Sequence, residues 1–199
     1  MKSTSSARYP IDLLDITLTF VPFGLLLGAA LLAGETADDP TMSRTVYTIW
    51  VTTVLVTPAL CAFALPGDSP RKRSLWILFW TFAFVAYSVH MLYANFGVYH
   101  GSFQEFIAGQ GVFPAIINVI FTLWWTVDVL LAWFHDDAPR WVQVQRIAAH
   151  MFIGLTFFAS TVILKRGFIN VLGAGMTTVV LVCLLARFDA SRAARPDAT

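Results

Sequence analysis

The sequence predicts an all-α, polytopic integral membrane protein that crosses the bilayer as a bundle of about six helices, with both termini in the cytoplasm. Hydrophobic residues make up 57% of its 199 residues and charged residues 13%, whereas about a quarter of a soluble domain is charged. Six apolar stretches approach the length of about 20 residues that a helix needs to cross a bilayer. Basic residues gather in alternate connections between these stretches. The lipid bilayer is therefore the first partner that the sequence predicts.

The six expected spans cover residues 13–34, 45–65, 74–96, 113–134, 147–164 and 168–185. The first is longer than the apolar core of about 7–15 residues in a secretory signal, and acidic residues follow it, so we expect a retained span. A Pro-Gly-Asp-Ser-Pro turn at 66–70 separates the second span from the third. Only residues 165–167 separate the last two spans, which form either a hairpin or one long helix with a break. Two spans suit the length better.

Orientation follows from the basic residues, which stay on the cytoplasmic side of a membrane protein. An N-terminus inside the cell places many more of them in the cytoplasm than outside. The cytoplasmic set is Lys2, Arg8, Arg71, Lys72, Arg73, Arg140, Arg146, Arg187, Arg192 and Arg195, and the external set is Arg44, Lys165 and Arg166. This bias predicts a multi-pass protein of the cell inner membrane with its N- and C-termini inside. Trp76, Trp133 and Trp141 are then expected at the cytoplasmic headgroups.

One transmembrane domain is expected over residues 1–188, followed by a polar, disordered cytoplasmic tail over 189–199. The external connection 97–112 contains four glycines and several aromatic residues, which favours a structured cap over a free loop. Cys61 and Cys183 fall in apolar stretches and suggest small buried side chains rather than a disulfide framework. The formal net charge of +1 provides no basic field that would attract nucleic acid.

No sequence motif of an enzyme is present, so candidate sites rest on ionisable residues at membrane depth, which are costly there and default to functional hypotheses. Asp128 is the sharpest case, because it lies well within the fourth span. Trp125 and Asn118 lie on a neighbouring stripe of the same helix. These residues predict a pocket with an aromatic wall and an acidic floor. The alternative is a carboxylate that only fixes helix packing through a hydrogen bond.

Two histidines fall on the same cytoplasmic side. His135 ends the fourth span and His150 lies one turn inside the fifth. Facing imidazoles on adjacent helices could hold a haem iron or another metal. A helix-end histidine that contacts backbone carbonyls or headgroups is the simpler interpretation.

A second candidate corner lies at the external side, where His90, His100 and Glu105 carry atoms that suit zinc, copper or iron. Their spacing matches no known motif. The alternative is a hydrogen-bonded network that docks the glycine-rich cap.

Three functions from different classes follow from these candidates. The first is a subunit of a redox or electron-transfer assembly that binds haem, a quinone or another apolar cofactor and that works with a protein partner or a second copy. The second is a transporter or proton-conducting protein that uses Asp128. The third is a metal-dependent membrane enzyme that acts on a lipid or another apolar substrate. The sequence narrowly favours the first and leaves open whether the protein is an enzyme.

Overall fold

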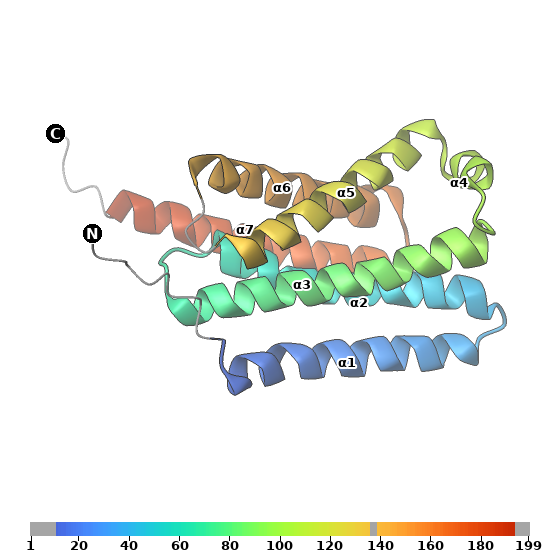
Figure 1. Cartoon of the computed structure of the whole chain (residues 1–199), viewed down its shortest axis with the longest axis horizontal. Helices are drawn as coiled ribbons and strands as arrows, with labels where there is room; N and C mark the ends of the chain where they lie inside the picture. Colours follow the sequence, from blue (N-terminus) through green and yellow to red (C-terminus); the bar gives the residue numbers. More distant parts are fainter. Residues whose placement is uncertain (1–10, 136–138, 194–199) are drawn as a thin grey trace.

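The computed structural model describes residues 11–135 and 139–193, and every regular element in these ranges is a helix (Figure 1). The elements are α1 (Leu13–Glu35), α2 (Pro40–Ala64), α3 (Pro70–Leu92), η1 (Tyr93–Val98), α4 (Phe103–Gln110), α5 (Val112–Phe134), α6 (Arg140–Phe158), η2 (Ala159–Leu164) and α7 (Phe168–Ala193). The segments η1 and η2 are π-helical continuations of α3 and α6. Six of the helices are long and apolar enough to cross a membrane. The predicted all-α fold with six spans is confirmed.

The first three helices begin at side-chain caps. The Asp12 carboxylate accepts a hydrogen bond from the Asp15 backbone N–H at 2.7 Å, and Asp39 accepts one from the Met42 N–H at 3.0 Å. The Ser69 hydroxyl oxygen accepts one from the Lys72 N–H at 3.2 Å. Such caps satisfy N–H groups that the first turn of a helix leaves without a partner. Local sequence therefore sets where these helices start.

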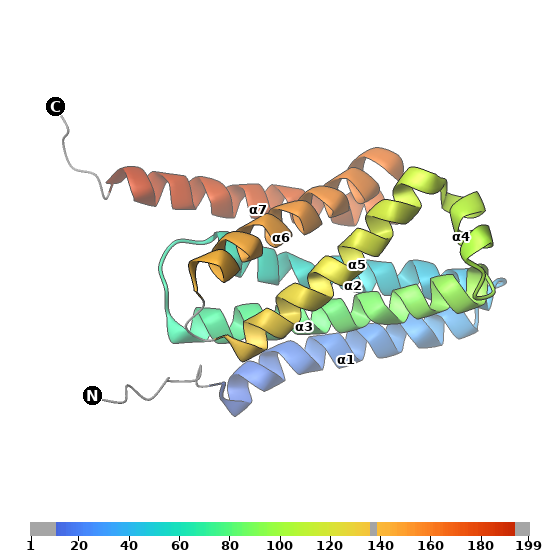
Figure 2. The ribbon, with the colours of Figure 1, turned by 45° about the horizontal axis from the view of Figure 1, so that its top comes forward.

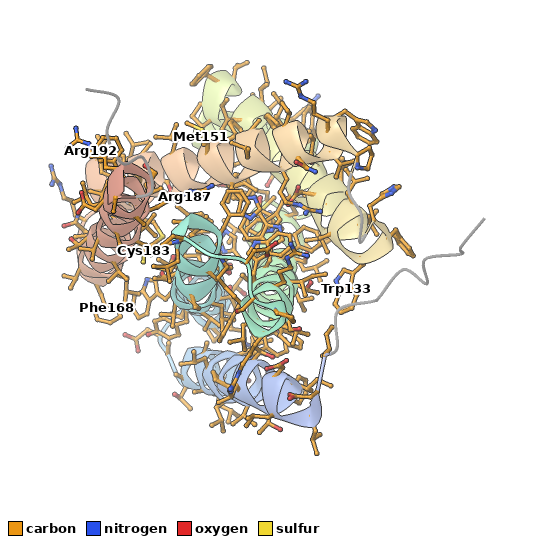
Figure 3. All side chains as sticks on the ribbon, turned by 90° about the vertical axis from the view of Figure 1, so that its left-hand side faces the viewer. Trp133, Met151, Phe168, Cys183, Arg187 and Arg192 are labelled. Carbon is orange, nitrogen blue, oxygen red and sulfur yellow. The ribbon has the colours of Figure 1, made fainter. Side chains whose placement is uncertain are left out.

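Helices α2 and α3 form the centre of the bundle. Figure 2 shows α1 lying along one side of them while α5 and α6 cross on the other, and Figure 3, which looks along the bundle, shows α7 beside α2. Half of the apolar window of α2 is buried, against 11% for α1 and for α7. The outer helices therefore present most of their apolar surface to lipid.

The two ends of the bundle differ in charge. Helix α1 begins and α7 ends at the same end, where the α2–α3 connection, the end of α5 and the start of α6 also lie (Figure 1). We call it the basic end; its described basic residues are Arg71, Lys72, Arg73, Arg140, Arg146, Arg187 and Arg192. The opposite end carries η1 and α4, and we call it the cap end. Arg44, Lys165 and Arg166 belong to it.

Several boundaries differ from the sequence prediction. Helix α6 starts at Arg140 rather than at 147, because a helix can continue through polar residues that an apolar window does not register. Helix α7 runs to Ala193, so residues 189–193 are helical and not the start of a disordered tail. Residues 194–199 of that expected tail lie outside the described residues. The 165–167 segment separates two helices, which confirms the hairpin.

The predicted cap is a structured element. It contains the eight-residue helix α4, which the Ser102 hydroxyl caps. His100 and Gly101 precede it with positive φ values of 50° and 73°, a conformation that turns the chain sharply and that glycine adopts readily. The chain therefore reverses direction at the cap end in a defined way.

Candidate functional site

Asp128 is the one ionisable side chain of α5, and it has no exposed surface. It lies six residues before the end of the helix, or about 9 Å along its axis. Its Oδ2 accepts a hydrogen bond of 2.9 Å from Trp80 Nε1 and lies 3.8 Å from His150 Nδ1. Its Oδ1 is buried and has no hydrogen-bond partner among the described residues. The carboxyl group is therefore only half satisfied at membrane depth.

The His150 ring is held between two aromatic faces. Its centroid lies 4.0 Å from that of Phe63 and 4.0 Å from that of Trp80, with interplanar angles of 21° and 13°. The imidazole side chain is 3% exposed. It links α2, α3 and α6 at the same depth as Asp128.

The hydrogen bonds of His150 define its tautomer. Trp76 Nε1 can only donate and lies 2.9 Å from His150 Nε2, so Nε2 is the acceptor and carries no proton. The backbone oxygen of Arg146 can only accept and lies 2.8 Å from Nδ1, so Nδ1 carries the proton. The ring is consequently neutral in this arrangement, and both of its nitrogens are engaged.

Two further groups complete the polar surroundings. The Arg146 guanidinium carbon lies 4.8 Å from the centroid of the Trp76 ring, and Arg146 is close enough to Asp128 to act on it electrostatically. The Gln145 amide approaches the same carboxyl group, although neither of its polar atoms has a hydrogen-bond partner within the described ranges.

Trp125 closes the cluster on the side of the cap end. Its ring packs on Trp80 at 4.9 Å and on Tyr87 at 5.5 Å between centroids. It is fully buried, and its Nε1 has no hydrogen-bond partner in the part of the chain that the structure describes. The inner cluster, as we name this set from here on, consists of Asp128, His150, Trp76, Trp80, Trp125 and Arg146.

Three helices are enough to build the inner cluster, because its residues are three or four apart on each of them. Trp76 and Trp80 are four residues apart on α3, and so are Arg146 and His150 on α6. Trp125 and Asp128 are three apart on α5. Residues at these separations share a helix face, so three helices each contribute one face to a single polar centre in an otherwise apolar core.

Sequence reasoning found Asp128, His150 and Trp125 but missed the two tryptophans of α3. Trp76 was expected at the headgroups; it is instead 7% exposed and turned into the bundle. Trp80 is fully buried. The signal that marks them is a pair of tryptophans four residues apart within one span, since an indole N–H inside a membrane needs an acceptor.

Two predicted residues lie away from the inner cluster. The Asn118 amide donates a hydrogen bond to the Gln110 side chain of the cap, and it precedes Asp128 by ten residues, or about 15 Å of helix. His135 is exposed at the end of α5, where its ring meets Trp141. The structure therefore does not place His135 opposite His150.

The external candidate corner is divided. His90 Nδ1 lies 2.8 Å from the backbone oxygen of Thr45, whereas His100 Nδ1 lies 2.9 Å from Glu105 Oε2 on the surface of the cap. Across residues 11–135 and 139–193, no three histidine, cysteine or acidic side chains converge in a way that could hold a metal ion. His90, His100 and Glu105 are thus not assembled as one ligand set.

Two apolar grooves lie elsewhere on the bundle. One, of about 360 Å³, runs between η1, α4 and α5, with Thr122 and Asn95 among its few polar residues. The other, of about 330 Å³, lies between α1, α2 and the start of α7, beside Trp50. Neither is lined by a residue of the inner cluster.

Comparisons of the chain with family models, with curated proteins and with solved structures found no match.

Proposed function

We propose that this protein moves protons across the membrane, alone or coupled to a solute, and that Asp128 is the group that binds and releases them. The supporting observation is the buried Asp128 carboxyl group, whose Oδ2 lies 2.9 Å from Trp80 Nε1 and 3.8 Å from His150 Nδ1 while its Oδ1 has no hydrogen-bond partner among the described residues. An intramembrane carboxyl group costs free energy that packing alone does not require, and such groups mark proton relays.

His150 is suited to deliver the proton. A proton that binds Nε2 creates an imidazolium between the faces of Phe63 and Trp80, and aromatic faces stabilise a cation. The Nδ1 proton can then pass to Asp128 Oδ2 after the two atoms, now 3.8 Å apart, move to hydrogen-bond distance. His150 gains one proton at Nε2 and loses one from Nδ1, which leaves a neutral imidazole of the opposite tautomer and a neutral carboxylic acid.

Protonation of His150 Nε2 would also change the contact between α3 and α6. Protonated Nε2 and Trp76 Nε1 are both donors, so their 2.9 Å hydrogen bond cannot persist. Proton uptake by His150 therefore separates Trp76 of α3 from α6 at the basic end. A conformational step of this kind is what couples a proton to the movement of a solute.

We also propose that the basic end faces the cytoplasm of a cell membrane, because basic residues are retained on that side. The inner cluster then lies in the cytoplasmic half of the bilayer.

The test is proton flux in proteoliposomes that contain the purified protein, driven by a potassium diffusion potential and followed with an internal pH-sensitive dye. Asp128→Asn should abolish flux, because an amide cannot take up the proton. Glu105→Gln is the matched control, since it neutralises an exposed acid of the cap, and it should leave flux unchanged.

An infrared difference spectrum supplies a second readout that needs no solute. Lowering the pH should raise a protonated-carboxyl band that Asp128→Asn removes and Glu105→Gln keeps. Flux that persists in Asp128→Asn, or wild-type protein with neither flux nor such a band, would overturn the proposal.

The redox-subunit hypothesis stays a prediction. The association with a protein partner or a second copy also stays a prediction. Haem ligation at His150 is the weaker alternative, because iron needs an imidazole lone pair and Trp76 already binds Nε2. A metal-dependent enzyme is weaker still, since the described residues bring together no three ligands.

A further inference from the structure

The C-terminal end of α2 attracts two cations from other helices. Lys72 of α3 donates from Nζ to the backbone oxygen of Leu65 at 3.0 Å and also to that of Gly67. Arg187 of α7 donates from Nη1 to the backbone oxygen of Phe63 at 3.3 Å. The last carbonyl oxygens of a helix carry partial negative charge and therefore attract both cationic side chains.

The two cations lie within electrostatic reach of each other. No ion pair joins either of them to a carboxylate within residues 11–135 and 139–193, because the nearby Asp68 pairs with Arg73 and Asp15 lies 3.7 Å from Arg71. The end of α2 therefore carries an excess of positive charge that its carbonyl dipoles only partly offset.

The Arg187 guanidinium uses only part of its hydrogen-bonding capacity in this contact. A guanidinium carries five N–H groups, and the hydrogen bond to Phe63 uses one of them. The remaining fork suits the oxygens of a phosphate group. Lys72 has its donors directed at carbonyls and contributes its charge.

Exposed leucines lie next to the groups of this corner along the chain: Leu65 carries a carbonyl that Lys72 binds, and Leu184 and Leu185 precede Arg187 on α7. Leu65 is 38% exposed, Leu184 46% and Leu185 63%. Two cations that form no ion pair with a carboxylate of the described residues, next to exposed leucines, fit a molecule with an anionic head and apolar chains. Figure 3, which faces the basic end, shows Arg187 and Cys183 on α7 beside α2.

We propose that Lys72 and Arg187 form a binding corner for the phosphate of an anionic phospholipid. Basic pockets between spans are a recognised site for such headgroups. The charge complementarity at the end of α2 and the neighbouring leucines select a lipid over free phosphate, which has no chains to bury. The corner is separate from the inner cluster, so this proposal does not depend on proton transfer.

The test is native mass spectrometry of the full chain, released from mixed micelles that contain equal amounts of phosphatidylglycerol and phosphatidylcholine. The double variant Lys72→Gln/Arg187→Gln should reduce the preference for phosphatidylglycerol by up to about thirtyfold, since each basic residue near the surface is worth about fivefold. The matched control is Lys165→Gln/Arg166→Gln, which removes the same two charge types at the cap end and should keep the preference.

A third variant guards against a folding artefact. Lys72→Arg/Arg187→Lys keeps both charges and should retain phosphatidylglycerol to within a few-fold of wild type, whereas added inorganic phosphate should not displace it. Equal lipid preference in both double Gln variants would overturn the proposal. Displacement by phosphate alone would also overturn it, by showing a phosphate site without lipid selectivity.

Discussion

A histidine ring that lies between two aromatic faces has little freedom to rotate, and His150 is held in this way by Phe63 and Trp80. Because Trp76 and the Arg146 carbonyl fix opposite roles for its two nitrogens, the ring can accept a proton at only one of them. The two nitrogens of His150 would therefore have different roles in a proton transfer. In the proposed transfer, the proton therefore enters on the Trp76 side and leaves on the Asp128 side.

The hydrogen bond from Trp80 to Asp128 should contribute to stability in a measurable way. Trp80→Phe keeps a ring but removes the N–H, which leaves both carboxyl oxygens of Asp128 without a hydrogen-bond partner among the described residues. We expect the free energy of unfolding to fall by about 1–3 kcal/mol, the usual cost of removing a buried hydrogen-bond partner. Equilibrium unfolding in a denaturing detergent measures it.

Trp125→Phe is the control, because the same atoms are removed from an equally buried ring and Trp125 Nε1 has no hydrogen-bond partner in the described chain. Its loss should cost less than that of Trp80 by roughly the value of one such bond. Equal costs for the two substitutions would show that the hydrogen bond to Asp128 contributes nothing.

Several residues of the inner cluster could be named from the sequence, but the hydrogen bonds between them could not be predicted. An acid inside an apolar span is visible in any sequence, so Asp128 could be named. His150 was expected one turn inside its span, but it lies ten residues after the start of α6. Trp76 was misplaced because tryptophan also prefers the membrane interface, and only the partner on another helix decides between the two environments. The link from Trp76 to His150 spans 74 positions, which no local pattern encodes.

Helix α7 packs closely against η2 at Gly173. A Cβ atom on Gly173 would overlap the side chain of Thr161, whose hydroxyl is already bonded to the Phe157 backbone oxygen at 2.7 Å. Thr161 is short, β-branched and buried, so it cannot swing aside as a flexible side chain would. The backbones must separate if the glycine is replaced.

Gly173→Ala should therefore lower the free energy of unfolding by about 1–3 kcal/mol, the range for overpacking a filled site. Gly175→Ala, two residues along the same helix, meets nothing within 4 Å and should be neutral or stabilising by up to about 1 kcal/mol. Thermal unfolding of the two variants in one detergent makes the comparison. An equal change in stability for both variants would show that the contact between residue 173 and Thr161 does not decide the outcome.

The helices themselves were largely predictable, because an apolar run of span length has one stable conformation in lipid. The sequence boundaries were least accurate where polar residues extend a helix beyond the apolar run, as at Arg140 and Ala193. The hairpin at 165–167 was correct. The π-helical segments η1 and η2 were not foreseen, since their extra residue per turn leaves no compositional mark.

The whole molecule is asymmetric in charge along its long axis, and this asymmetry predicts its direction in the membrane. In a background with Cys61→Ala and Cys183→Ala, a membrane-impermeant maleimide should label Lys165→Cys in intact cells. Ala190→Cys, at the basic end, should react only after permeabilisation. The reverse pattern of labelling would place the basic end outside.

The close contact of two indoles with one imidazole has an optical consequence. Trp76 donates its N–H to His150 and Trp80 lies flat against the same ring. An imidazolium quenches indole fluorescence by accepting an electron from the excited ring, whereas a neutral imidazole does so far less. The emission of these two residues therefore reports the charge on His150, and the protein carries its own indicator at the centre of the bundle.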